Sequence, residues 1–151
     1  MNSEKLSEKI AEIRKTFSFD TLLSSYKEEI VKLVSLMERY GKTNQQLSDL
    51  KLQMDRLSMS MMKEITEASY EEGGKLKKRF SNDESRKAEL ESRKSESDEF
   101  CTFLDLESSC LSEKLDLQTS LEHSKFVLSI IKSEIEVQRA IILYLTNNGT
   151  D

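Results

Sequence analysis

Proline and tryptophan are absent from this sequence, and glycine occurs only four times in 151 residues. At the average usage of roughly 5%, a chain of this length would hold about seven prolines. Proline breaks helix interiors because it lacks an N–H and clashes with the preceding turn. Its absence therefore permits very long helices, and the abundance of Leu, Lys, Glu and Arg favours them. The sequence predicts an all-α protein.

The sequence also lacks a strong excess of either charge. Its formal net charge is -5 and its pI is about 5.1. A mildly acidic balance gives no general attraction for nucleic acid, so we expect no nucleic-acid partner.

Cysteine is equally scarce. Cys101 and Cys110 are nine residues apart, which places them on opposite sides of one predicted helix and prevents them from pairing with each other there. Two free thiols fit a reducing compartment. The first residues, MNSEKLSEKIAEIRK, have no apolar core of the kind a signal peptide needs. We therefore expect a cytoplasmic or nuclear location.

Patterns typical of catalytic, cofactor or metal sites are missing as well. The single histidine, His123, does not share one helix face with the two cysteines, and there is no C-x-x-C pair. No glycine-rich phosphate loop occurs. The basic stretch KLKKR, residues 75–79, is bracketed by acidic residues and is typical of a solvated connection. We expect no enzymatic activity, no cofactor and no bound metal.

Apolar residues in the first half recur at steps of four and three, the spacing of a coiled-coil stripe. The runs are Leu6, Ile10, Ile13, Phe17, then Phe19, Leu23, Tyr26, Ile30, Leu33, Met37, Tyr40, then Leu47, Leu50, Met54, Leu57, Met61, Ile65. The offset near Phe17 indicates a register break or a helix end, and Asp20 is a suitable N-cap for a new helix there. Gly41 costs a helix about 1 kcal/mol relative to alanine. Asn44 falls on the stripe, and its phase then shifts. We therefore predict an interruption near Gly41.

Residues 71–99 are mostly polar. Gly73-Gly74 would cost a helix roughly 2 kcal/mol, so we predict a break there and a connection over 71–82. Ser81 and Glu84 form a capping-box pattern that opens the next segment. Residues 83–99 are predicted to be a solvated polar helix or disordered.

The C-terminal part carries two apolar stripes side by side. The inner stripe contains Leu117, Leu121, Ser124, Leu128, Ile131, Ile135, Gln138, Ile142 and Leu145. The outer stripe contains Val127, Ile130, Val137, Ile141 and Tyr144. Together they are too wide for a two-stranded seam, so we expect at least two other helices to cover them, as in a bundle. Asn147-Asn148-Gly149 is a suitable helix end.

The stretch FVLSIIKSEIEVQRAIILYL, residues 126–145, is the most apolar of the chain. It contains two acidic and two basic residues, Lys132, Glu134, Glu136 and Arg139. Each charge at the centre of a bilayer costs roughly 2.5 to 3.5 kcal/mol. We therefore expect no membrane span.

These segments predict an elongated coiled coil, with a coiled-coil part at 1–70, a polar connection at 71–99, a coiled-coil or bundle helix at 100–147 and a tail at 148–151. A parallel assembly matches the stripes most simply. The alternative is a hairpin that turns within 82–98 and lays 47–70 against 110–133. A turn at the glycine pair would instead set apolar 54–65 against polar 82–93. A compact globular fold matches the pattern least.

The predicted function is that of a non-enzymatic structural or adaptor subunit. It would assemble an intracellular protein complex by pairing with itself or with a related coiled-coil subunit. The predicted interaction residues are Tyr26, Ile30, Leu33, Met37, Leu50, Met54, Leu57, Met61, Leu121, Leu128, Ile131, Ile135, Ile142 and Leu145. The alternative is a helical-hairpin chaperone or cargo binder, which would hold clients on exposed apolar faces. These are the wide C-terminal face and a methionine cluster of Met54, Met59, Met61 and Met62.

Overall fold

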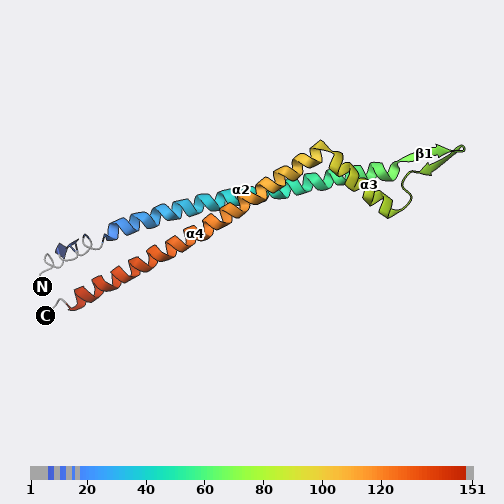
Figure 1. Ribbon diagram of the computed structural model, residues 1–151. Coiled ribbons are helices and arrows are strands. Elements are labelled where there is room, and N and C mark those ends of the chain that lie inside the picture. The colour runs from blue at the N-terminus through green and yellow to red at the C-terminus, as the bar shows by residue number, and fades with distance from the viewer. Residues whose placement is uncertain (1–6, 9–10, 13–14, 16–17, 149–151) are drawn as a thin grey trace. The chain divides into compact units, whose positions relative to one another are not determined.

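The computed structural model describes residues 7–8, 11–12, 15 and 18–148, except for the side chains of Leu145 and Asn148. Its elements follow in the order α2 (Phe19–Glu67), β1 (Ser69–Glu72), β2 (Lys75–Lys78), α3 (Asp83–Glu96) and α4 (Asp98–Asn148) (Figure 1). The expected helical class is confirmed, and the two long helices pack antiparallel. The chain divides into a first unit, Met1–Tyr40 with Leu117–Asp151, and a second unit, Gly41–Asp116.

In the first unit, the beginning of α2 packs antiparallel to the later part of α4. Leu22 lies beside Ile130 and Ile141, whereas Leu36, further along α2, lies beside His123, which comes earlier in α4. The α2 residues on the inward side recur at steps of four and three: Leu22, Tyr26, Glu29, Leu33, Leu36 and Tyr40. Opposite them, the predicted inner stripe of α4 is the packed one, with Leu117, Leu121 and Ser124 buried.

The stripe on α2 differs from the predicted one at three places, since Leu22, Glu29 and Leu36 stand where Leu23, Ile30 and Met37 were expected. Ile30 and Met37 were expected on it, but their side chains are 39% and 57% exposed. Glu29 and Leu36, one residue earlier in each case, face α4 instead. The polar Glu29 is tolerated there because the hydroxyl of Ser124 donates a hydrogen bond to its carboxylate.

The predicted interruption near Gly41 does not occur, because α2 continues through it. Thr43 and Leu47 are buried directly after it, and Thr43 rather than Asn44 takes the stripe position. The packing of these residues offsets the low helix propensity of one glycine. At the other end, α2 begins at Phe19 after Ser18, whose φ is positive (52°), so that the predicted cap Asp20 lies in the first turn.

In the second unit, the predicted break at Gly73-Gly74 is confirmed, and the connection contains an antiparallel hairpin of β1 and β2. Its register pairs Tyr70 with Lys77 and Glu72 with Lys75. Gly73 and Gly74 have φ values of 61° and 75°. Two consecutive residues with positive φ are what a two-residue type I′ turn requires, and glycine adopts them without steric cost.

Residues 83–96 form a helix, α3, which settles the choice between a polar helix and disorder. Its N-cap is Asn82 rather than Ser81: the Asn82 side chain accepts a hydrogen bond from the Ser85 N–H at 2.7 Å. After α3, Ser97 caps α4, where its hydroxyl accepts from the Phe100 N–H at 3.2 Å.

The two long helices are also antiparallel in the second unit, where Leu50 lies beside Leu106 and Cys110, and Lys51 is 3.9 Å from Glu107. The expected parallel pairing is therefore not the arrangement of this chain. The predicted hairpin is correct in kind but not in register, because 47–70 was placed against 110–133. The connection begins directly after α2, before the expected turn at 82–98, and contains the β-hairpin and α3, which an Arg93–Glu64 ion pair at 3.1 Å ties to α2.

Candidate protein-interaction surface

The outer stripe of α4 leaves several apolar side chains of the first unit open to solvent. Ile130 is 47% exposed, Val137 59% and Tyr144 67%, and Phe126 beside them is 63% exposed. Val127 and Ile141 are half-buried. Scattered apolar residues are normal on a protein surface, but a continuous row of them marks an interaction site. The single helix α2 covers the inner stripe and leaves the outer one open.

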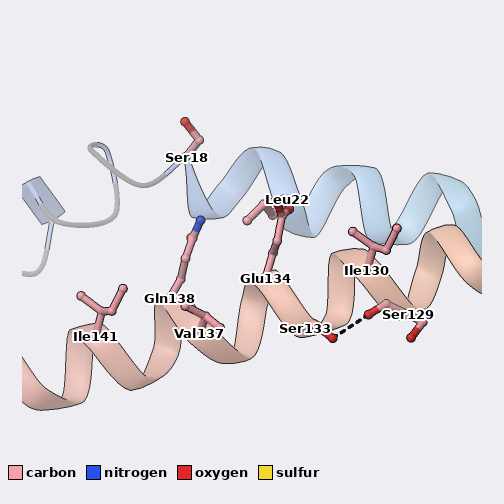
Figure 2. Close-up of a pocket in the computed structure, with 9 residues that line it drawn as sticks. All are labelled: Ser18, Leu22, Ser129, Ile130, Ser133, Glu134, Val137, Gln138 and Ile141. Atoms are coloured by element: carbon pink, nitrogen blue, oxygen red, sulfur yellow. Dashed lines mark hydrogen bonds between the residues drawn. The ribbon is translucent and has the colours of Figure 1, made fainter.

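A groove lies along this outer stripe, between α4 and the beginning of α2. We call it the Ile130 groove, and its volume is about 660 Å³. Figure 2 shows the residues that line it, which are Ser18, Leu22, Ser129, Ile130, Ser133, Glu134, Val137, Gln138 and Ile141. The Ser133 hydroxyl donates to the Ser129 carbonyl at 3.0 Å. Two of the lining residues of α4 are therefore small serines, one of them with its donor already used, which leaves room for a closely packed element.

Two polar side chains stand out in the Ile130 groove. In Figure 2, Glu134 and Gln138 extend from α4 toward α2, where Leu22 and Ser18 lie. The Oε1 atom of Gln138 is buried and has no hydrogen-bond partner among the described residues. No described side chain forms an ion pair with Glu134. The groove therefore offers two acceptors without donors.

A polar layer interrupts the apolar contact between α2 and α4 in the same unit. Ser124 is fully buried, and its hydroxyl donates to Glu29 Oε1 at 2.5 Å. Lys32 lies 3.3 Å from the same oxygen. The hydrogen bond from Ser124 lowers the pKa of the Glu29 carboxyl below its ordinary value, because it stabilises the ionised form. Burial acts in the opposite direction, while Lys32 and His123 add to the lowering.

The predicted interaction residues divide into three groups in the structure. Eleven are buried or half-buried on the stripes that α2 and α4 turn toward each other: Tyr26, Leu33, Leu50, Met54, Leu57, Met61, Leu121, Leu128, Ile131, Ile135 and Ile142. Ile30 and Met37 are exposed. Leu145 belongs to α4, but its side chain lies outside the described residues. Most of the predicted set thus lies on the helix contact within the chain.

The groove was only partly visible in the sequence. The outer stripe and its excess width were predicted, but Glu134 and Gln138 were not recognised as groove residues. Their position depends on which side of α4 is turned toward α2. Glu134 does carry one signal, since it stands four residues after Ile130 and three before Val137, in the spacing of the outer stripe.

The β-hairpin of the second unit is exposed along both strands. Leu76 is 79% exposed, and Lys77 pairs with Glu72 of the opposite strand at 2.6 Å. The basic stretch KLKKR therefore lies on and beside β2, with an acidic residue of β1 neutralising part of its charge.

The two cysteines, the remaining candidates for a metal site or a disulfide, are not among the residues of the Ile130 groove. Cys101 is exposed and Cys110 is half-buried, and they do not form a disulfide. Within the described part of the chain, no cluster of His, Cys, Asp and Glu is arranged to hold a metal ion. Over the same residues, none of the helices has an apolar stretch sufficient to cross a bilayer. Comparisons with protein-family models, with curated proteins and with solved structures find no match to this chain.

Proposed function

We propose that this chain is a non-enzymatic adaptor subunit that binds a partner protein along the outer stripe of α4. One observation carries the proposal: exposed apolar residues of α4 repeat at coiled-coil spacing beside a stripe that α2 already covers. A helix with two such stripes needs two neighbours, and the first unit supplies one of them. The partner would complete the helical bundle.

An intracellular setting for this assembly follows from the cysteines. Cys101 and Cys110 are free thiols, and Cys101 is exposed. Free thiols persist in the reducing conditions of the cytoplasm or nucleus, whereas secreted proteins mostly oxidise them. The assemblies that use such adaptors include cytoskeletal, kinetochore, centrosomal and vesicle-tethering complexes.

The proposal is tested with substitutions that change the outer stripe alone. Glutamate at both Ile130 and Val137 should leave the chain helical but abolish retention of its partner, because two buried carboxylates would oppose docking. Replacing Ile131 and Ile135 with aspartate would not test the outer stripe, because those residues belong to the inner stripe and their replacement would separate α2 from α4. The measurement is co-purification of the tagged chain from its native cells, with circular dichroism as the folding check.

The matched control replaces Ser92 and Ser95, exposed residues of α3, with glutamate. This variant should retain the same partner in the same amount. If the Ile130 and Val137 variant also retains it, binding takes place elsewhere and the proposed surface is wrong.

The second candidate function is a chaperone or cargo binder for unfolded clients. The wide distribution of exposed apolar residues favours it, since Met59 in the second unit is 69% exposed and Phe126 in the first 63%. A chaperone of this kind would suppress the aggregation of several unrelated unfolded proteins. An adaptor would instead hold one folded partner at fixed stoichiometry and leave such aggregation unchanged.

A further inference from the structure

We propose that the Ile130 groove binds a partner helix that places an arginine against Glu134 and Gln138. This inference rests on the proposed function and specifies the chemistry of the partner. It combines the spacing of the apolar groove residues with the two acceptors that the groove leaves without donors.

The spacing indicates that the occupant is an α-helix. Ile130, Glu134, Val137 and Ile141 follow one another at steps of four, three and four. Such a row stays aligned with a neighbouring helix over successive turns, whereas an extended strand would match a period of two. The small Ser129 and Ser133 beside this row let a second backbone approach closely.

The charge indicates which helix fits. A helix that covers the groove would remove water from the Glu134 carboxylate, beside a Gln138 Oε1 that is already buried without a donor. An acceptor that loses water without gaining a donor weakens binding, and a charged acceptor does so more strongly. Glu134 and Gln138 stand one turn apart on α4, and an arginine carries five N–H donors in a planar fork. One arginine side chain can therefore donate to the exposed Glu134 carboxylate, and to Gln138 when the Gln138 side chain turns its oxygen into the groove.

A second copy of this chain does not supply that arginine on the same surface. Between residues 126 and 144, the positive side chains are Lys132 and Arg139. They stand about 160° and 140° away from Glu134 around the helix, at offsets of two and five residues. Pairing this face with its own copy would bring a second Glu134 and no cation to the interface. Like charges that lose water together destabilise such a contact.

The experiment uses the full chain and two synthetic helical peptides of about three heptads with leucine at the a and d positions. One peptide carries arginine beside its central apolar layer and the other carries glutamate there. Fluorescence anisotropy measures the affinity of each labelled peptide. We expect the wild-type protein to prefer the arginine peptide. Glu134→Gln should weaken the affinity for that peptide roughly five- to tenfold, the range of a charge pair at an interface.

Charge reversal provides the decisive arm. Glu134→Arg should invert the preference, so that the glutamate peptide binds more tightly than the arginine peptide. The matched control Glu136→Gln changes an exposed carboxylate on the other side of α4 and should leave both affinities as in wild type. Val137→Glu should abolish binding of both peptides while circular dichroism stays unchanged.

Several outcomes would overturn the inference. Equal affinities for the two peptides, or no effect of Glu134→Arg, would mean that the carboxylate does not select the partner. Peptide binding only after removal of residues 1–17 would identify the chain's own N-terminal segment as the occupant. A dimer that Val137→Glu converts to a monomer would identify a second copy. If substitution of Glu134 has no effect but the Ile130 and Val137 variant still loses its cellular partner, the proposed function stands and only the proposed arginine contact is wrong.

Discussion

At the scale of single residues, the pair Glu29 and Ser124 has the largest consequence for specificity. Both stand at stripe positions where an apolar residue would pack, and both are satisfied by the hydrogen bond between them. A polar layer of this kind contributes little net stability, but a shift of either helix by one turn would leave both groups buried without a partner. The layer therefore favours one alignment of α2 against α4 in the first unit.

The Glu29 carboxylate should make the stability of the chain depend on acid. Its pKa is lowered in the folded state, so its stabilising contribution is complete above the unfolded pKa and is lost as the pH falls through the folded pKa. Below about pH 4.3, the ordinary pKa of a glutamate, the melting temperature of Glu29→Gln should therefore fall less than that of the wild type. Thermal unfolding followed by circular dichroism between neutral and acidic pH measures this difference.

A second variant separates the hydrogen bond from the charge. Ser124→Ala removes the donor and should lower the free energy of unfolding at neutral pH by about 1 to 3 kcal/mol, because Glu29 then lacks its main partner. It should also flatten the acid dependence in the same direction as Glu29→Gln. An unchanged acid dependence in both variants would show that Glu29 does not contribute in this way.

Sequence reasoning failed on α2 at the same residues. Ile30 and Met37 are apolar and fit a spacing of four and three as well as Glu29 and Leu36 do. The choice between the two stripes depends on α4, because the hydrogen bond from Ser124 allows Glu29 to face inward. On α4 the inner stripe was predicted correctly, because it is apolar except at Ser124 and Gln138 and no alternative stripe has as many members.

At the scale of elements, the glycines show how context decides what one residue type does. Gly41 lies inside α2, and a Cβ added there would meet no atom within 4 Å. Gly73 and Gly74 also have free space, but their φ values of 61° and 75° are unfavourable for other residues. The sequence marks all three as helix breakers, and only the pair acts as one. The hairpin around the pair was missed, although two glycines between short polar-apolar segments are a known hairpin signal.

Alanine substitutions at these glycines should have opposite effects. Gly41→Ala should raise the free energy of unfolding by about 1 kcal/mol, because alanine has the higher helix propensity and meets no clash. Gly74→Ala should weaken the β1–β2 hairpin by about 1 to 2 kcal/mol, because it forces a left-handed conformation on a residue with a Cβ. Urea unfolding measures the first effect, and cross-strand nuclear Overhauser contacts between Tyr70 and Lys77 measure the second.

The control for the hairpin is Gly73→Asn. Asparagine tolerates positive φ, and Asn-Gly is the preferred pair in a type I′ turn. It should preserve the cross-strand contacts that Gly74→Ala loses. A destabilising effect of Gly41→Ala, or intact contacts in Gly74→Ala, would contradict the conformations described for these glycines.

At the scale of the whole molecule, helix direction was the property that periodicity could not fix. An apolar stripe matches a parallel copy and an antiparallel segment equally well, because spacing carries no direction. Direction is decided by the connection, whose hairpin and Asn82 cap depend on local backbone conformation rather than on apolar spacing. Helical class, the break at Gly73-Gly74 and the excess width of the C-terminal face were predictable because composition and spacing determine them.

The antiparallel pairing leads to a prediction about the isolated chain in solution. In the first unit α2 already covers the inner stripe of α4, and in the second unit it packs against the earlier part of α4, so self-association is not needed to bury these residues. The purified chain should therefore be a helical monomer with a mass near 17.5 kDa, as measured by light scattering behind a sizing column. Its exposed outer stripe should make it bind a hydrophobic dye, and Val137→Glu should reduce the fluorescence of the bound dye. Val31→Glu, on the opposite side of α2 from the inward stripe, should reduce that fluorescence less. A stable dimer that Val137→Glu leaves intact would contradict this expectation, because the inner stripe of α4 would then be buried by another copy rather than by α2.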